Sequence, residues 1–137
     1  MSPDLPDEIA LELEQLQILF SQYRGTIDKY RADIPDGFEK LALAGIVHSF
    51  YTGVENICKR IVIHTTGTLP QGDFWHRQLL DSLARPQDDR PAIFSPSLHT
   101  LLLQYMKFRH VFRQIYGFRL EWDKMAFLVL QLHFFPC

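Results

Sequence analysis

A dense group of basic and aromatic residues near the end of the chain is the part best suited to chemistry. Four Lys or Arg residues and one His fall within residues 107–119, and no acidic residue follows until Glu121. The formal net charge of the chain is only −2, so this segment is a local basic patch within a slightly acidic protein. Its basic members are Lys107, Arg109, His110, Arg113 and Arg119. Such a patch predicts contact with phosphate groups.

Helical geometry would place three of these side chains on one face. At 100° per residue, Arg109, Arg113 and Tyr116 fall within about 60° of one another. Two guanidinium groups side by side match the oxygens of a phosphodiester, and a tyrosine beside them can stack on a base. His110 and Gln114 form a pair four residues apart on the next face. Spacing alone also allows a solvated basic helix end that is stabilised by the helix dipole.

The same segment resembles the signature of HEPN-domain toxins, specifically the HepT-like ribonucleases that are paired with nucleotidyltransferase antitoxins. That signature is Arg, four residues, His, one residue and Tyr. Arg109 and Tyr116 match it, whereas Gln114 stands where the family has its catalytic His. Residues 50–57 and 69–76 also resemble the second-helix segment and the connector of this family. The likeness therefore covers most of the chain.

The resemblance implies a five-helix, HEPN-like domain that forms a homodimer or a larger homo-oligomer, in which two signature helices meet at a shared cleft. It implies an RNA endonuclease that acts on tRNA or mRNA without a metal or other cofactor. The 2′-hydroxyl attacks the adjacent phosphate, Arg stabilises the charge on phosphorus, and His handles the proton. Arg109 would bind the scissile phosphate, while Arg113, Lys107 and Arg119 would contact RNA. Because the antitoxin of such pairs transfers AMP to the signature tyrosine, Tyr116 would be the modified residue.

Gln114 leaves the activity open, because a glutamine amide does not titrate near neutral pH and cannot exchange protons as His does. His110 can take the role of the base, since it is adjacent to Arg109 and titrates near neutrality. Alternatively, the chain cleaves RNA weakly by phosphate stabilisation and positioning alone. A third interpretation is a catalytically silent module that binds RNA or a nucleotidyltransferase antitoxin. A different class of function, a helical adaptor that docks a protein on its Phe-rich C-terminal face, has the least support.

Three residues of the second predicted helix accompany the basic segment. His48, Tyr51 and Glu55 share one face of that helix, which predicts a buried polar network. Glu55 would pair with an arginine of the fourth helix and orient it. A glutamate in solvent, or bonded to a tyrosine, is the alternative for Glu55.

Apolar residues that alternate three and four positions apart predict an all-α fold, an antiparallel bundle of about five helices. The two long N-terminal helices are joined by a short turn and should form a hairpin. We expect one domain over residues 1–137, because this length suits a single core. The predicted helices cover about residues 7–31, 38–64 and 74–84, then a fourth from Ser95-Pro96 to Gly117 and a last one from near Trp122 that stops at Pro136.

Several residues mark where these helices begin, end or pack closely. Asp73 and Ser95 are predicted N-caps of the third and fourth helices, and Gly117 is predicted to end the fourth helix in a left-handed conformation. Gly45 and Gly53 lie inside the second helix, where glycine costs about 1 kcal/mol relative to alanine. We expect both to allow close helix packing.

The remaining patterns argue against other classes of site. His76 has no Cys or Asp partner at metal-ligand spacing, and no Cys-x-x-Cys or His-Glu-x-x-His motif occurs, so no metal site is expected. Cys58 and Cys137, without a secretion signal, indicate reduced thiols. The longest C-terminal apolar run is far too short to cross a bilayer. The sequence therefore predicts a cytoplasmic protein with no membrane contact.

Overall fold

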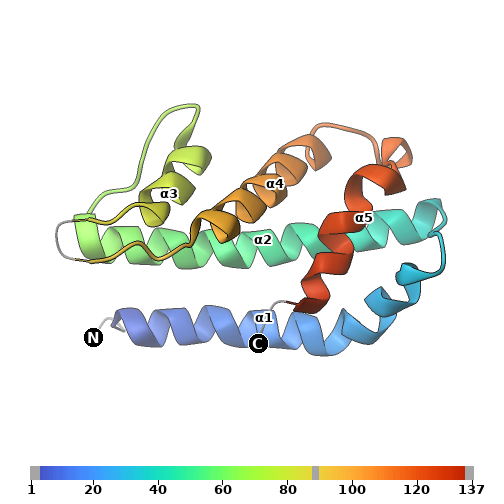
Figure 1. Ribbon diagram of the computed structural model, residues 1–137, viewed down its shortest axis with the longest axis horizontal. Coiled ribbons are helices and arrows are strands. Elements are labelled where there is room, and N and C mark those ends of the chain that lie inside the picture. Colours follow the sequence, from blue (N-terminus) through green and yellow to red (C-terminus); the bar gives the residue numbers. More distant parts are fainter. Residues whose placement is uncertain (1–3, 88–89, 135–137) are drawn as a thin grey trace.

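The computed structural model describes residues 4–87 and 90–134, and within these ranges it has five α-helices and no β-strand (Figure 1). The predicted all-α fold is therefore confirmed. Pro136 and Cys137, to which the sequence assigned a helix stop and a reduced thiol, lie outside the described residues. The elements are α1 (Leu5–Asp28), η1 (Lys29–Arg31), α2 (Gly37–Thr66), α3 (Trp75–Ala84), α4 (Pro96–Phe112), η2 (Gly117–Arg119), α5 (Trp122–Gln131) and η3 (Leu132–Phe134), where η marks a short 3₁₀ turn.

The long helices α1 and α2 form the predicted antiparallel hairpin (Figure 1). Its contact follows the apolar periodicity of both helices: Leu16, Phe20 and Ile27 are buried on α1, and the rings of Phe20 and Phe50 lie 5.9 Å apart. Each large apolar side chain that is fully buried contributes about 1.5–3 kcal/mol. The hairpin is therefore a stable base for the shorter helices.

Local signals define the beginnings of three helices. Asp4 caps α1, since its Oδ1 accepts a hydrogen bond from the Asp7 amide at 3.1 Å. Asp36 and Glu39 form a reciprocal capping box at the start of α2. Ser95 caps α4 through the Leu98 amide, as the sequence predicted. These bonds satisfy amide groups that the first helical turn leaves without partners.

The predicted cap of α3 is wrong. Phe74, not Asp73, occupies the N-cap position, and no side chain caps that helix. The helix starts one residue later than predicted, and Asp73 instead lines a groove at the surface. Packing of the adjacent Trp75 against the core sets the start of α3, because burial of an aromatic ring outweighs a single cap.

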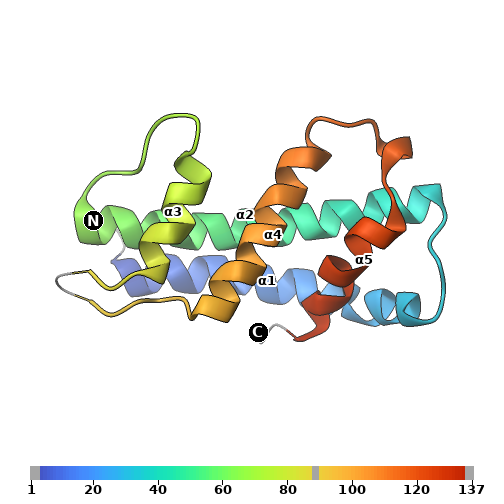
Figure 2. The ribbon, with the colours of Figure 1, turned by 45° about the horizontal axis from the view of Figure 1, so that its top comes forward.

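All the other helices pack against α2. The Tyr105 hydroxyl on α4 donates to the Leu128 carbonyl of α5 at 2.6 Å, and the Tyr105 ring lies 5.1 Å from that of Phe50 on α2. This buried tyrosine therefore ties three helices together. As a result, the start of α3 and the end of α4 project along the same edge of the molecule (Figure 2).

The fourth helix ends earlier than predicted. It stops at Phe112, and Gly117 is not left-handed, because the only glycines with positive φ in the described ranges are Gly67 and Gly72. An added Cβ on Gly117 would lie 3.0 Å from Leu41 Cδ1. Glycine is therefore needed here for close approach to α2, not for a left-handed turn.

Of Gly45 and Gly53, the two glycines in the interior of α2, only Gly53 supports close helix packing. A Cβ there would lie 2.7 Å from Leu16 Cδ2 of α1, whereas a Cβ on Gly45 would meet no atom within 4 Å. The prediction for Gly45 is therefore wrong, because its face opens into a surface groove. Cys58 is fully buried on the same helix, and burial raises the pKa of its thiol to about 12. Across the described ranges, none of the helices combines the length and apolar character that crossing a membrane would need.

Candidate functional site

A groove of about 740 Å³ lies between the start of α3 and the last turns of α4. Four of its eleven lining residues are Lys or Arg, and one is acidic. The cations are Arg77, Lys107, Arg109 and Arg113, with His76 and His110 beside them. The groove therefore gathers most of the basic segment that the sequence singled out and adds residues of α3 to it. Its charge suits an anionic ligand.

Arg109 and Arg113 occupy successive turns at the end of α4, and both line this groove. Arg109 is half-buried, and its Nε is buried without a hydrogen-bond partner among the described residues. Neither guanidinium forms an ion pair with a carboxylate of residues 4–87 or 90–134. Two cationic groups that share a groove and lack acidic partners can bind a phosphate together.

His110 and Gln114 also line the groove, and both are exposed. The Gln114 amide nitrogen lies 3.4 Å from His110 Nε2, so the predicted pairing of these residues is confirmed. In this contact the amide stands beside the imidazole without supplying a titratable group.

Tyr116 departs from the predicted face. Because α4 ends at Phe112, Tyr116 has extended backbone angles and does not follow the helical spacing of Arg109 and Arg113. It is 76% exposed, its ring stacks on Phe118 at 5.7 Å, and it does not line the groove. The predicted face of three side chains is therefore wrong for Tyr116 and correct for the two arginines.

The outer basic residues lie at a second hollow, between α4 and α5. Lys107 lines both hollows, whereas Arg119 lines only the second and packs its guanidinium over the Phe118 ring at 5.7 Å.

The polar face of α2 lies behind the groove. Tyr51 and Glu55 are buried and His48 is half-buried. The predicted network is nevertheless wrong, because Tyr51 Oη and His48 Nδ1 have no hydrogen-bond partner among the described residues. Glu55 also does not orient an arginine of α4. Its Oε2 lies 2.8 Å from His76 Nδ1, and its Oε1 lies 3.8 Å from Lys59 Nζ. The predicted pairing is wrong because α3 packs against α2 at this point and offers a nearer partner.

The positive charges at the end of α4 shift the pKa values of residues behind the groove. Burial lowers the pKa of His48, and the positive charges of Arg109 and Arg113 lower it further. Burial raises the pKa of Tyr51, and the Glu55 carboxylate adds to that shift while Arg109 opposes it. The hydroxyl of Tyr51 nevertheless forms no hydrogen bond of ordinary geometry with a described residue. His48 is therefore held neutral close to two arginines.

Comparison with known families supports the resemblance that the basic segment carries. A family model described as HepT-like protein matches residues 42–134, which is more than half of the chain. The chain belongs to the HepT-like family. No curated protein and no solved structure matches it. The matched region begins inside α2 and includes every residue of this HepT-like protein that lines the groove.

The sequence analysis did not predict that His76 of this HepT-like protein pairs with Glu55. It considered His76 only as a metal ligand and set it aside for want of a partner at the right spacing. The sequence feature that could have indicated this pairing is the position of Glu55, which shares its helix face with the buried residues Tyr51 and Cys58. A buried carboxylate needs hydrogen-bond donors, and a donor from another helix was therefore to be expected.

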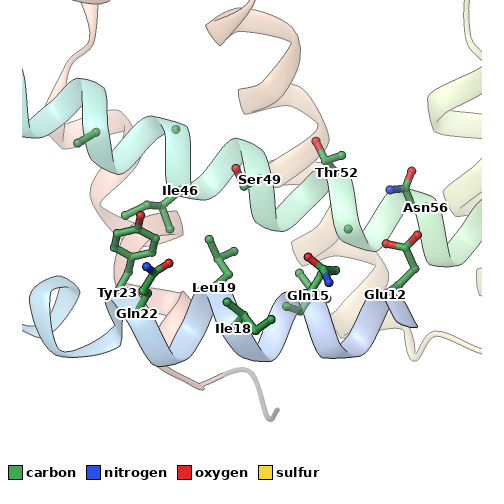
Figure 3. A pocket seen from close by; sticks show the side chains of 14 residues that line it. Glu12, Gln15, Ile18, Leu19, Gln22, Tyr23, Ile46, Ser49, Thr52 and Asn56 are labelled. Atoms are coloured by element: carbon green, nitrogen blue, oxygen red, sulfur yellow. The ribbon is translucent and has the colours of Figure 1, made fainter. Parts of the chain in front are cut away.

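A further hollow of about 630 Å³ lies between α1 and α2 (Figure 3). Apolar and amide side chains such as Ile18, Gln22 and Ile46 line it, and its one carboxylate, Glu12, is held by Arg60 at 3.0 Å. It lacks cations that could bind phosphate. The part of the chain that the structure describes also contains no cluster of His, Cys, Asp and Glu that could hold a metal ion. The groove at α3 and α4 is thus the best candidate site of this HepT-like protein.

Proposed function

We propose that this HepT-like protein is a metal-independent RNA endonuclease, the toxin of a toxin–antitoxin pair, and that the groove between α3 and α4 binds its RNA. The observation that carries the proposal is the open placement of Arg109 and Arg113 on one groove, where neither forms an ion pair with a carboxylate of the described residues. An arginine guanidinium can bind two phosphate oxygens at once through parallel N–H···O hydrogen bonds, that is, in bidentate geometry. Membership of the HepT-like family supports the same reading.

In the proposed reaction, the 2′-hydroxyl of the RNA attacks the neighbouring phosphorus. The O2′–P bond forms and the P–O5′ bond breaks, leaving a 2′,3′-cyclic phosphate and a free 5′-hydroxyl. Arg109 and Arg113 stabilise the negative charge that grows on the phosphate oxygens. His110 is exposed and lines the groove, and an imidazole can exchange protons, so His110 takes part in proton transfer where the Gln114 amide cannot.

Two partners belong to the proposal. A homodimer would place two such grooves at a shared cleft, and exposed apolar residues near the groove, among them Val111 and Phe127, support a subunit contact there. A nucleotidyltransferase antitoxin would transfer AMP to Tyr116. The 76% exposure of that tyrosine supports the assignment, since a second protein can reach its hydroxyl.

The second candidate function is a silent module that binds RNA or the antitoxin without cleavage. Gln114 in the place of the family's catalytic His is the observation that favours it. The two functions differ in whether the phosphodiester breaks, so a cleavage assay separates them.

The test is cleavage of a labelled oligoribonucleotide by the purified protein in the presence of a chelator. We expect cleavage of RNA and none of a strand with 2′-deoxy sugars. Arg109→Ala should lower the rate by about 10²–10³, because it removes a group that stabilises the transition-state charge. Arg85→Ala is the matched control, since Arg85 is exposed at the end of α3 and lies outside the groove.

The same pair of variants can be followed in bacterial cells. Wild type should arrest growth, Arg85→Ala should arrest it equally, and Arg109→Ala should not. RNA that is bound with a steep dependence on salt but never cut would reject the nuclease in favour of the silent module.

A further inference from the structure

The second histidine of the groove is held by a buried acid. His76 is the second residue of α3, and its Nδ1 lies 2.8 Å from Oε2 of Glu55 in the middle of α2. Glu55 is 3% exposed, and its other oxygen lies 3.8 Å from Lys59 Nζ. A carboxylate that is taken out of water is stable only when it is paired in this way. The histidine is therefore anchored from behind, within the protein.

This anchoring decides which ring nitrogen can accept a proton. A carboxylate only accepts hydrogen bonds, so Nδ1 of His76 must carry the hydrogen, and the lone pair of the neutral ring lies on Nε2. Nε2 makes no hydrogen bond to a residue that the structure describes, although His76 is one of the residues that line the groove. The lining of the groove thus includes an imidazole of fixed orientation together with Arg109 and Arg113.

No other histidine of the described ranges combines these features. His64, His99 and His133 have acidic partners but lie outside the groove. His110 lines the groove, yet its partner is the Gln114 amide and not a carboxylate. His48 also lies outside the groove lining.

We propose that His76, oriented by Glu55, is the proton acceptor that replaces the histidine missing at position 114. The inference rests on the proposed RNA cleavage. That reaction moves two protons, and one imidazole cannot accept the first and donate the second at the same moment. Nε2 of His76 takes the proton of the 2′-hydroxyl as the O2′–P bond forms. The imidazolium of His110 gives its proton to the 5′-oxygen as the P–O5′ bond breaks, and exchange with water restores both rings.

The first experiment compares wild type with His76→Ala on the labelled oligoribonucleotide. Loss of a general base lowers a rate by about 10²–10⁴, so we expect kcat to fall by that factor while KM changes little. Imidazole added at millimolar concentration should restore part of the lost rate. His64→Ala is the matched control, because it removes a histidine paired with a carboxylate outside the groove, and it should cleave like wild type.

The second experiment follows the ring itself. Nitrogen NMR of wild type should show the neutral His76 ring with hydrogen on Nδ1, and Glu55→Gln should reduce that preference. Glu55 acts here as a positioning residue, so Glu55→Gln should lower kcat less than His76→Ala does and should leave KM unchanged. Thermal melting of each variant verifies that it is folded.

The outcomes separate this inference from the proposed function. If wild type cleaves RNA and folded His76→Ala cleaves equally well, the role of His76 is overturned and the nuclease stands. If added imidazole restores none of the kcat that His76→Ala loses, that result would also count against a proton-transfer role. If wild type does not cleave RNA at all, both proposals fall together, whatever tautomer the NMR spectrum shows.

Discussion

Three polar atoms behind the groove have no hydrogen-bond partner among the described residues: Arg109 Nε, His48 Nδ1 and Tyr51 Oη. Leaving a buried polar atom unpaired costs about 1–3 kcal/mol. Side chains that weaken the fold in this way are usually retained for another reason. Here one of the atoms belongs to Arg109 itself, and the other two belong to His48 and Tyr51, whose pKa values the Arg109 charge lowers. The unpaired atoms therefore cluster at the arginine that we propose to bind phosphate.

The electrostatic link between His48 and the groove gives a direct test of this geometry. Arg109 lowers the pKa of His48, so Arg109→Ala should raise that pKa toward its ordinary value. Proton NMR titration of the His48 ring measures it, with Arg85→Ala as a control that should leave it unchanged. An unaltered His48 pKa in Arg109→Ala would mean that the two side chains are farther apart than the structure places them.

The same shift has a consequence for stability. Because folding lowers the pKa of His48, the unfolded chain binds this proton more readily than the folded chain does. The stability that neutral His48 contributes is therefore present above pH 6.5, its ordinary pKa. It is lost as the pH falls toward the lowered pKa.

Each helix of the bundle combines a local pattern with constraints from its neighbours. The fourth helix shows both: Ser95 begins it as the local cap predicts, but its end is set by packing. The rings of Phe108 and Phe112 lie parallel at 6.0 Å, and Phe112 also packs against His48 of α2 at 5.8 Å. Beyond these contacts the chain leaves the helix, and the next element, η2, contacts α2, so the helical spacing of the basic segment ends there.

Gly45 and Gly53, the two interior glycines of α2, should respond in opposite directions to the same substitution. Gly45→Ala should raise the free energy of unfolding by about 1 kcal/mol, because alanine favours the helix and its Cβ meets no atom within 4 Å. Gly53→Ala should fail to stabilise and should lower that free energy by up to about 2 kcal/mol, because overpacking against Leu16 offsets the helical gain.

Urea denaturation of both variants beside wild type measures this difference. Each glycine serves as the control for the other, since both lie within α2 and receive the same added methyl group. Equal stabilisation by the two substitutions would contradict the close approach of α1 and α2 at Gly53.

The assembled fold makes α2 the common contact of all the other helices, and it leaves several large apolar side chains at the surface. Val111 is 49% exposed and lines both the proposed RNA groove and the hollow between α4 and α5. Phe127 and Phe118 are 54% and 78% exposed in the same part of the chain. Apolar residues gathered beside a functional groove are typical of an interaction surface, which supports the proposed dimer.

We therefore expect Val111→Glu to convert the proposed dimer to a monomer, because a carboxylate at an apolar contact is costly to desolvate. Light scattering coupled to size-exclusion chromatography measures the mass in solution. Leu11→Glu on α1 is the matched control, because Leu11 is 54% exposed and lies outside both hollows. A Val111→Glu variant that stays dimeric would place the subunit contact elsewhere.

The helices, several of their ends and the basic segment could be predicted from the amino-acid order alone. Apolar spacing is repeated in every turn of α1 and α2, and the Ser95-Pro96 start is encoded within a few residues. Side chains only three or four positions apart along one helix meet for the same reason, which is why the pairing of His110 with Gln114 was correct.

Contacts between helices were decided only when the chain was folded. Glu55 and His76 are 21 residues apart, and no local pattern states that α3 docks beside Glu55 in place of an arginine of α4. The position of Tyr116 likewise depends on where packing against α2 ends the fourth helix. Hydrogen bonds between distant segments depend on the relative placement of whole helices, and that placement follows from the burial of the entire core.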